Sequence, residues 1–190
     1  MGLPQKERIS LEEYYRMRET SDRLLEYIDG IVYMSPSPST KHQRTSMRLS
    51  STLFAFLQGK PCEVFSAPFD VELQRDEVKG NTIVIPDLSV ICDKTGLTEQ
   101  KYIGVPAVII EILSPSNQSH DLVTKLNLYM QYGVKEYWIV NPISDSILIY
   151  VLNNNGEYEL DIPPATGTAH SIVLDGFAVN LTDLFATVPD

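Results

Sequence analysis

Residues 106–116, PAVIIEILSPS, contain a nearly continuous apolar run that is interrupted by one glutamate, Glu111. Such a run is typical of a central strand that is covered on both faces. The next apolar strand is EYWIVNP at residues 136–142, and residues 121–132 between the two carry a helical pattern that ends at Gly133. The order of strand, helix and strand predicts a crossover connection.

Further elements lie on both sides of this unit. Residues 9–20 predict a helix with Ser10 and Glu13 as its capping box, and residues 23–34 predict a hairpin with a type I′ turn at Asp29-Gly30. A second helix is expected from a cap at Ser39 or Thr40 to about residue 58, with an apolar stripe of Met47, Leu49, Leu53, Phe54 and Leu57. Strands are predicted at 62–67, 69–73, 83–91, 147–152 and 157–160, and a short helical turn at 181–185.

The length and composition predict one domain over residues 1–190. The apolar fraction of 43% is ordinary for a soluble α/β or α+β protein, and no apolar stretch is long enough for a membrane span. The first residues lack the apolar core of a signal peptide, and Cys62 and Cys92 stand alone without metal-ligand spacing. These features favour a reducing cytoplasm and argue against a membrane partner.

The formal net charge of −10 argues against a general nucleic-acid coat protein, because such binding depends on Lys and Arg that neutralise phosphates. A nuclease is compatible with this charge, since acidic residues at a metal site repel a phosphate backbone until the cation binds. Contact with DNA would then depend on the metal and on a local basic patch. The best candidate patch comprises Lys41, His42, Arg44 and Arg48.

Two carboxylates lie in strongly apolar sequence. Asp87 follows Pro86, and because proline removes a ladder hydrogen bond, this strand is expected at an edge or kinked at that point. The alternative for Asp87 is a strand-end aspartate that faces solvent. Glu111 lies in the predicted central strand, where a glutamate is almost never fully buried without a partner. It therefore indicates either a functional site or a buried salt bridge.

Lys125 distinguishes between these interpretations. It falls on the apolar stripe of its helix with Leu122 and Tyr129, so the sequence predicts that it points toward the core. The alternative is a surface pair with Asp121 at i,i+4 spacing, worth about 0.3 kcal/mol. A lysine beside two carboxylates can hold an attacking water or stabilise charge on a reacting phosphate.

Four segments together resemble one family: residues 27–44 (YIDGIVYMSPSPSTKHQR), 84–91 (VIPDLSVI), 106–129 (PAVIIEILSPSNQSHDLVTKLNLY) and 132–142 (YGVKEYWIVNP). They are similar to the large bacterial family of restriction-endonuclease-like proteins that is abundant in cyanobacteria, a branch of the PD-(D/E)XK nuclease superfamily. The specific features are PD, E-x-L-S-P-S, and D-x-x-x-K-x-x-x-Y followed by G-V-x-E-Y-W. The resemblance covers residues from about 11 to 185.

The resemblance implies an α/β (α+β) restriction endonuclease-like fold, with a central mixed β-sheet flanked by helices and a β-hairpin that carries the two acidic residues. Asp87, Glu111 and the backbone carbonyl of Ile112 would bind Mg²⁺ or Mn²⁺. The usual superfamily lysine falls at Leu113, so the lysine has moved to the following helix, where Lys125 matches. Lys125 would position the nucleophilic water.

Five further residues are second-rank candidates. His42 matches a family position and would touch a phosphate or a metal-bound water, although a single histidine is more often an ordinary buried or exposed residue. Glu26 also matches, and either faces the site or points to solvent. Ser114, Pro115 and Asp121 are expected to shape the site through the strand exit and the helix start.

These observations leave three functional hypotheses. The first is a Mg²⁺-dependent or Mn²⁺-dependent endonuclease that hydrolyses phosphodiester bonds of DNA. The second is a catalytically inactive accessory or binding protein of a mobile-element or defence system on the same fold. The third is a structural oligomer-forming domain with Tyr137, Trp138 and residues 147–152 as its apolar interface. A homodimer is expected because two-fold symmetry is the commonest oligomeric arrangement.

Overall fold

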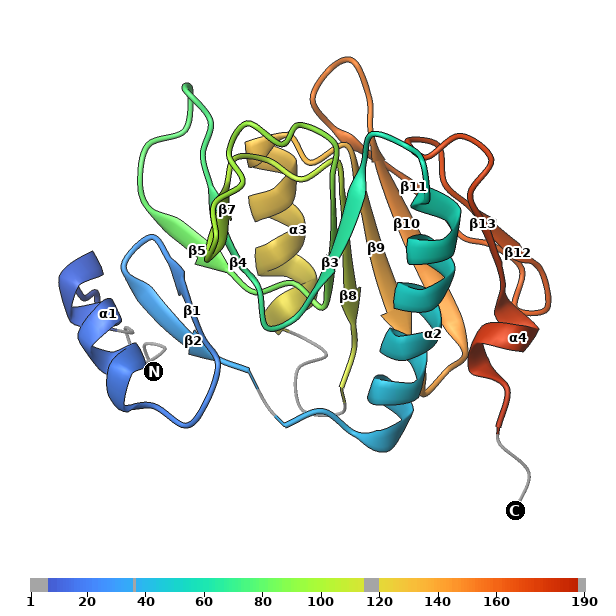
Figure 1. The fold of residues 1–190 in the computed structure, drawn as a ribbon, viewed down its shortest axis with the longest axis horizontal. Coiled ribbons are helices and arrows are strands. Elements are labelled where there is room, and N and C mark those ends of the chain that lie inside the picture. The colour runs from blue at the N-terminus through green and yellow to red at the C-terminus, as the bar shows by residue number, and fades with distance from the viewer. Residues whose placement is uncertain (1–6, 36, 115–119, 188–190) are drawn as a thin grey trace, which may run out of the picture.

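The computed structural model describes residues 7–35, 37–114 and 120–187 of the chain. A small sheet and α1 lie at one end of the molecule and α4 lies at the other, with a large sheet and two longer helices between them (Figure 1). The hydroxyl oxygens of Ser10 and Ser39 accept hydrogen bonds from the backbone N–H groups of Glu13 and His42, both at 3.2 Å, which confirms the predicted N-caps of α1 and α2. The helices are α1 (Leu11–Thr20), α2 (Thr40–Leu57), α3 (His120–Tyr132) and α4 (Leu181–Phe185).

The N-terminal hairpin belongs to a five-stranded sheet with the order β2-β1-β5-β4-β7. Asp29 and Gly30 at its turn have φ angles of 48° and 88°, as the predicted type I′ turn requires. Strands β4 and β7 are parallel, and the other neighbours are antiparallel. The strands are β1 (Leu25–Ile28), β2 (Ile31–Met34), β4 (Asp70–Leu73), β5 (Thr82–Val84) and β7 (Lys101–Ile103), of which β7 was not predicted.

The larger sheet has six strands in the order β11-β10-β9-β8-β6-β3. Strand β8 is antiparallel to β6 and parallel to β9, and α3 connects β8 to β9, so the predicted central strand and crossover are confirmed. Two short strands that were not predicted, β12 (Thr168–His170) and β13 (Ala178–Asn180), form a separate pair. The strands of the large sheet are β3 (Glu63–Ser66), β6 (Leu88–Ile91), β8 (Val108–Ile112), β9 (Glu136–Asn141), β10 (Ser146–Leu152) and β11 (Tyr158–Asp161).

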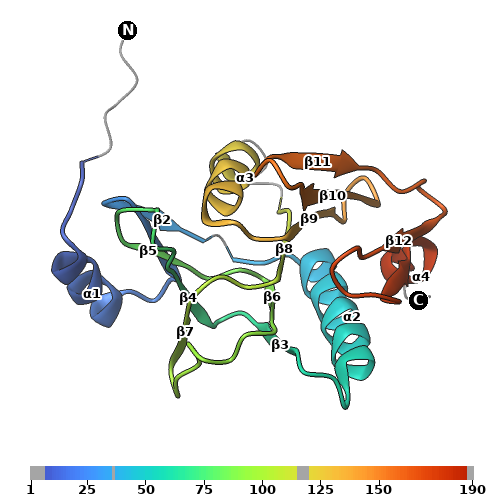
Figure 2. The ribbon, with the colours of Figure 1, turned by 90° about the horizontal axis from the view of Figure 1, so that it is seen from above.

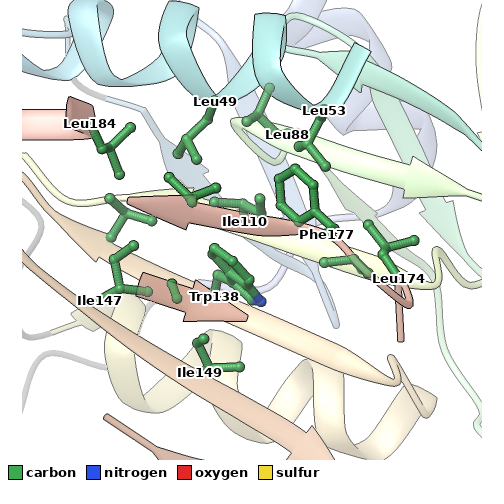
Figure 3. Close-up of a cluster of buried hydrophobic side chains, with 14 of the residues drawn as sticks. Leu49, Leu53, Leu88, Ile110, Trp138, Ile147, Ile149, Leu174, Phe177 and Leu184 are labelled. Carbon is green, nitrogen blue, oxygen red and sulfur yellow. The ribbon is translucent and has the colours of Figure 1, made fainter. Parts of the chain in front are cut away.

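Helices α2 and α3 lie on opposite sides of β8 and β9 (Figure 2), so the predicted central mixed sheet flanked by helices is confirmed. Leu49 and Leu53 of α2 pack on Ile110 and Trp138 in the core on one face (Figure 3). Tyr129 of α3 belongs to the core cluster on the other face. Each face of the large sheet therefore buries its own apolar cluster.

The side chains of β8 alternate between these two cores, as pleating requires. Ile110 and Ile112 belong to the cluster beneath α2, whereas Ile109 and the following Leu113 belong to the cluster beneath α3. Glu111 has the same alternation as Ile109 and Leu113. Its side chain is therefore directed to the α3 side of the sheet, which is the side on which Lys125 lies.

Pro86 separates β5 from β6 and so divides the predicted strand 83–91 between the two sheets. The predicted break at this proline is confirmed, because it cannot donate a ladder hydrogen bond. The alternative of an edge strand is wrong, since β6 has β3 on one side and β8 on the other. Asp87 thus lies at the junction of the two sheets, immediately before β6.

The predicted apolar stripe of α2 is wrong at two positions. Met47 and Phe54 are 67% and 62% exposed, whereas Leu49, Leu53 and Leu57 are buried. His42 and Thr45 complete the buried face instead. The correction follows from helical spacing, because residues 42, 45, 49 and 53 share one face at steps of three and four.

Tyr137 and Trp138 are buried in the two cores, so the interface predicted from them is wrong. Strand β9 lies between β8 and β10, which covers both of its edges. These aromatic residues stabilise the two cores. The hypothesis of a structural oligomer loses Tyr137 and Trp138, and in residues 147–152 the side chains of Ile147 and Ile149 are buried as well.

Cys62 and Cys92 form a disulfide bond, so the prediction that they stand alone is wrong. They continue the antiparallel register of β3 and β6 by one pair beyond Glu63 and Ile91, and this pairing brings residues 30 positions apart together. Disulfides are rare in a reducing cytoplasm, so the cysteines no longer support that location. Over the described ranges, none of the helices has the length and apolarity that a membrane crossing requires.

Candidate active site

Asp87 and Glu111 meet at one end of the β6–β8 pair. Leu88 is opposite Ile110 in the antiparallel register, so the next pair outward is Asp87 opposite Glu111. The backbone N–H of Ile112 donates to Asp87 Oδ2 at 2.7 Å, which fixes the aspartate against the end of β8. Strands β6 and β8 are antiparallel neighbours, but β7 lies between them in the chain. The predicted β-hairpin that carries both acidic residues is therefore wrong.

Lys125 of α3 is buried and lies between two glutamates. Its Nζ donates to Glu111 Oε1 at 2.9 Å and to Glu26 Oε1 at 3.0 Å. The side chains of Lys125, Glu111 and Glu26 are only 7%, 11% and 4% exposed. The predicted inward direction of Lys125 is therefore confirmed and the surface interpretation is wrong, while the side chain of Asp121 lies outside the described residues.

Each glutamate of this group accepts a second hydrogen bond. The hydroxyl of Tyr129 donates to Glu111 Oε1 at 2.8 Å, and the backbone N–H of Ile85 donates to Glu26 Oε1 at 2.8 Å. Tyr129 was expected only on the apolar stripe of its helix, and its polar role was not predicted. Its position four residues after Lys125 was the available signal, because such residues are neighbours on a helix.

Burial dominates the protonation of Glu111. Its pKa is raised from 4.5 to about 7: loss of hydration is the largest cause, Lys125 opposes the shift, and the charges of Asp87 and Glu26 add to it. Burial and the Glu111 charge likewise raise the pKa of the Tyr129 phenol well above its ordinary value, so Tyr129 remains a hydrogen-bond donor. Near neutral pH, the charge of the Glu111 carboxyl group therefore depends on the charged groups around it.

His42 lies in the first turn of α2 and contacts Asp87. Its Nε2 is 3.2 Å from Asp87 Oδ2, and the ring is largely buried. Burial lowers the pKa of His42, but the hydrogen bond and charge of Asp87, with the charge of Glu111, outweigh burial and raise it overall. His42 Nδ1 is buried and has no hydrogen-bond partner among the described residues.

The donors at this site suit a divalent cation that is shared with a substrate. Between described residues, every hydrogen bond to Asp87 reaches Oδ2 and every one to Glu111 reaches Oε1, which leaves one oxygen of each carboxylate for a cation. Those residues contain no group of three or more His, Cys, Asp and Glu arranged as a complete metal cage. Mg²⁺ is commonly held by one or two carboxylates together with waters and substrate phosphates, so the donor set fits.

The other residues that the sequence predicted for the site do not all lie in it. Ser114 is buried just after β8, and Leu113, at the position where the resemblance led us to look for a lysine, points into the core beneath α3. Pro115 lies outside the described residues. The four-residue basic patch is wrong in one member, because His42 turns inward to Asp87 while Lys41 and Arg44 are exposed.

Comparison with known proteins places the chain in a family. A family model named Uma2 and described as "Putative restriction endonuclease" matches residues 11–182. Two uncharacterised proteins of the cyanobacterium Synechocystis sp. are similar: slr1290 is 30% identical over 152 residues, which span 80% of this chain and 78% of that protein. The second, sll1609, is 24% identical over 136 residues, which span 70% of this chain and 75% of that protein.

A solved structure shares the fold. The crystal structure described as a "putative nuclease" from Anabaena variabilis superposes with a TM-score of 0.75 and covers 94% of this chain and 98% of its own, at 20% sequence identity. At that identity the likeness concerns the fold. The family model nevertheless spans most of the chain, from α1 to α4, and includes Asp87, Glu111 and Lys125. The protein therefore belongs to the Uma2 family, whose members are described as putative restriction endonucleases.

Proposed function

We propose that this protein is a metal-dependent endonuclease that hydrolyses phosphodiester bonds of DNA. One observation carries the proposal: Asp87 and Glu111 lie opposite each other at one end of β6 and β8, and the Lys125 ammonium from a third element lies 2.9 Å from Glu111. Two carboxylates and a cation in this arrangement suit phosphodiester hydrolysis. Membership of the Uma2 family supports the same reaction class.

Asp87, Glu111 and the Ile112 carbonyl would hold Mg²⁺ or Mn²⁺, which supplies positive charge to the phosphate when it is bound. Lys125 positions the attacking water and stabilises the negative charge that develops on the phosphate. Tyr129 and Lys125 fix the orientation of the Glu111 carboxylate through its Oε1 atom. His42 fixes Asp87 in the same manner through Oδ2.

Cleavage assays test this proposal. Supercoiled plasmid and labelled single-stranded and double-stranded oligonucleotides are incubated with Mg²⁺, Mn²⁺ or EDTA. We expect cleavage by the wild type with metal only, and a loss of at least about 100-fold in Asp87→Asn and in Glu111→Gln, equivalent to about 2.7 kcal/mol of transition-state stabilisation. Both variants keep the size of the side chain, and circular dichroism checks that they fold.

Glu72→Gln is the matched control, because Glu72 is also a strand glutamate that pairs with a lysine. Its Oε2 lies 2.6 Å from Lys101 Nζ in the small sheet, outside the candidate site. We expect Glu72→Gln to retain cleavage. Equal cleavage by the wild type and Asp87→Asn would refute the proposal.

A second candidate is a nuclease-fold accessory protein of a mobile-element or defence system that binds DNA or a protein without turnover. Two observations favour it: Leu113 occupies the usual lysine position, and Lys125 is bonded to two glutamates. Metal-dependent DNA binding by the wild type without cleavage of any substrate form would support this candidate over the first.

The proposal includes a homodimer in the cytoplasm. Two-fold pairing would bring one active site to each DNA strand. Size-exclusion chromatography with light scattering tests the dimer, and a monomer at micromolar concentration contradicts it. Thiol titration of freshly lysed cells tests the location, because the Cys62–Cys92 bond should be reduced in the cytoplasm.

A further inference from the structure

Helix α2 has an unusual charge for this protein. The whole chain has 25 acidic and 15 basic residues, yet Thr40–Leu57 contains Lys41, Arg44 and Arg48 and no aspartate or glutamate. This helix therefore carries a formal charge of +3 with His42 neutral, in a protein with a net charge of −10. A concentration of positive charge on one element is the electrostatic footprint of an anionic ligand.

The three cations of α2 share one side of the helix. Their spacing of three and four residues places Lys41, Arg44 and Arg48 on neighbouring turns of the same face. They line a cavity of about 60 Å³ together with the β9–β10 turn and the end of α4. A water molecule occupies roughly 10–15 Å³ of such a cavity, so this one has room for about four to six water-sized groups, which is comparable with one phosphate group.

Within the part of the chain that the structure describes, the cations of this face lack carboxylate partners. Lys41 Nζ donates to the Pro142 carbonyl at 3.5 Å, and Arg48 Nη1 donates to the Leu184 and Ala186 carbonyls at 2.7 and 2.8 Å. Among the described residues, no ion pair joins Lys41, Arg44 or Arg48 to a carboxylate, although Asp145 lines the same cavity. Arg48 thus has a structural task, and Lys41 and Arg44 are exposed and available to a ligand.

The same helix leads directly to the candidate active site. His42 follows Lys41 in the first turn of α2 and contacts Asp87 at 3.2 Å, so adjacent residues of this turn reach the site and the cavity. Lys41 and Arg44 are neighbours on the helix surface, with about 5–6 Å between their Cβ atoms, so two long side chains can reach neighbouring phosphates of one strand. The spacing of the cations and their position relative to Asp87 thus suit one strand of nucleic acid.

We propose that Lys41 and Arg44 bind neighbouring backbone phosphates of the nucleic-acid strand whose reacting phosphate lies at Asp87 and Glu111, while Arg48 adds positive charge to the same face and holds the end of α4. The inference rests on the proposed function for the identity of the strand. It adds the surface that holds the substrate and the direction in which the strand leaves the site, along α2 toward α4. It also explains how a protein with a net charge of −10 binds a polyanion.

Fluorescence anisotropy with a labelled DNA duplex tests this inference across a series of salt concentrations with Ca²⁺ in place of Mg²⁺. Every protein keeps Asp87 and Glu111, so that the site can hold a cation, and Ca²⁺ is chosen to keep the duplex intact. The test variant adds Lys41→Gln and Arg44→Gln, and leaves Arg48 in place because it holds the end of α4. The matched control adds Lys79→Gln and Lys135→Gln, which remove the same charge from exposed positions elsewhere.

We expect the Lys41→Gln, Arg44→Gln variant to bind at least about 10-fold more weakly near 100 mM salt, and its salt slope to fall by about 2, since each phosphate contact contributes about 0.9. The control should stay within about twofold of the parent protein, because isolated surface charges are screened at this salt. Equal weakening in both variants would overturn the inference. Unchanged affinity in both would also overturn it.

Two further experiments distinguish nucleic acid from a free anion as the ligand, and distinguish this inference from the proposed endonuclease. Protection of Lys41 and Arg44 from chemical modification by inorganic phosphate, with no DNA binding by the parent protein, would overturn the inference in favour of a site for free anions. Plasmid cleavage is measured separately in the same proteins with Mg²⁺. Weaker DNA binding by the test variant without any cleavage by the wild type supports this inference and refutes the endonuclease, whereas unchanged cleavage and binding in the test variant refutes this inference alone.

Discussion

Replacing Lys125 with methionine should destabilise the protein strongly at alkaline pH and weakly at acidic pH. Methionine keeps the length of the side chain and removes the cation that lies 2.9 Å from Glu111 and 3.0 Å from Glu26. Both carboxylates then remain buried, with Tyr129 and the Ile85 N–H as their hydrogen-bond donors. An uncompensated buried charge is one of the few single changes that remove a large part of a domain's stability.

The magnitude follows from burial and pKa. Removing one partner of a buried pair costs about 3–5 kcal/mol, which we expect at pH 8. The Glu111 pKa of about 7 is already above its unfolded value of 4.5, and loss of Lys125 raises it further because Lys125 lowers it. Below pH 6 the variant therefore holds Glu111 as a neutral carboxyl group, and the loss should shrink by at least about 1 kcal/mol.

Urea denaturation at pH 5.5 and pH 8 measures this difference. Lys94→Met is the control, since Lys94 pairs with Glu63 on the surface, where an ion pair is worth less than about 1 kcal/mol. In the Glu111→Gln background, Lys125→Met should cost less at pH 8 than it does alone, because one buried charge has been removed. A loss in Lys125→Met no larger than that in Lys94→Met, or an equal loss at both pH values, would refute the buried ion-pair argument.

Three further predictions follow from the same contacts. The folded pKa of Glu111 exceeds its unfolded value, so the stability that its proton provides is present below pH 4.5 and is lost as the pH rises to about 7. Glutamine does not titrate, so the free energy of unfolding of Glu111→Gln should rise relative to that of the wild type by up to about 3 kcal/mol between pH 4.5 and 8, as measured by urea denaturation. Mg²⁺ at 100 times its Kd should stabilise the wild type by about 2.7 kcal/mol in thermal denaturation and leave Asp87→Asn unchanged, whereas equal shifts would contradict a site at Asp87. Glu136→Ala should lower the free energy of unfolding in urea by about 2–4 kcal/mol, because it leaves the N–H groups of Ile172 and Val173 without an acceptor. A loss below about 1 kcal/mol would show that water replaces the carboxylate.

Local pattern was sufficient to predict the centre of the fold. The apolar run around Glu111 and the helix after it form β8, α3 and the crossover to β9, because burial on both faces and helical period act over a few neighbouring residues. The inward direction of Lys125 followed from the same periodicity. The capping serines and the Asp29-Gly30 turn were also predictable, since their contacts lie within three residues.

Features that depend on distant partners were not predictable. The short strand β7 exists because it pairs with β4 from 31 residues earlier, and Cys62 meets Cys92 only after β3 pairs with β6. Met47 and Phe54 were placed in the core because apolarity alone does not show which face of a helix meets the sheet. The hydroxyl of Tyr129 had no visible partner until the fold brought Glu111 to it.

The junction at Pro86 couples the position of the small sheet to the charged site at the end of the large sheet. On one side of it the Ile85 N–H holds Glu26 of β1, and on the other side Asp87 is held by the Ile112 N–H of β8. A shift of the N-terminal hairpin relative to the large sheet would therefore pull one carboxylate away from Lys125 and leave the other in place. Natural or engineered shortening of the first 30 residues would change the electrostatics of a centre built largely from residues 87–125, without altering any of those residues.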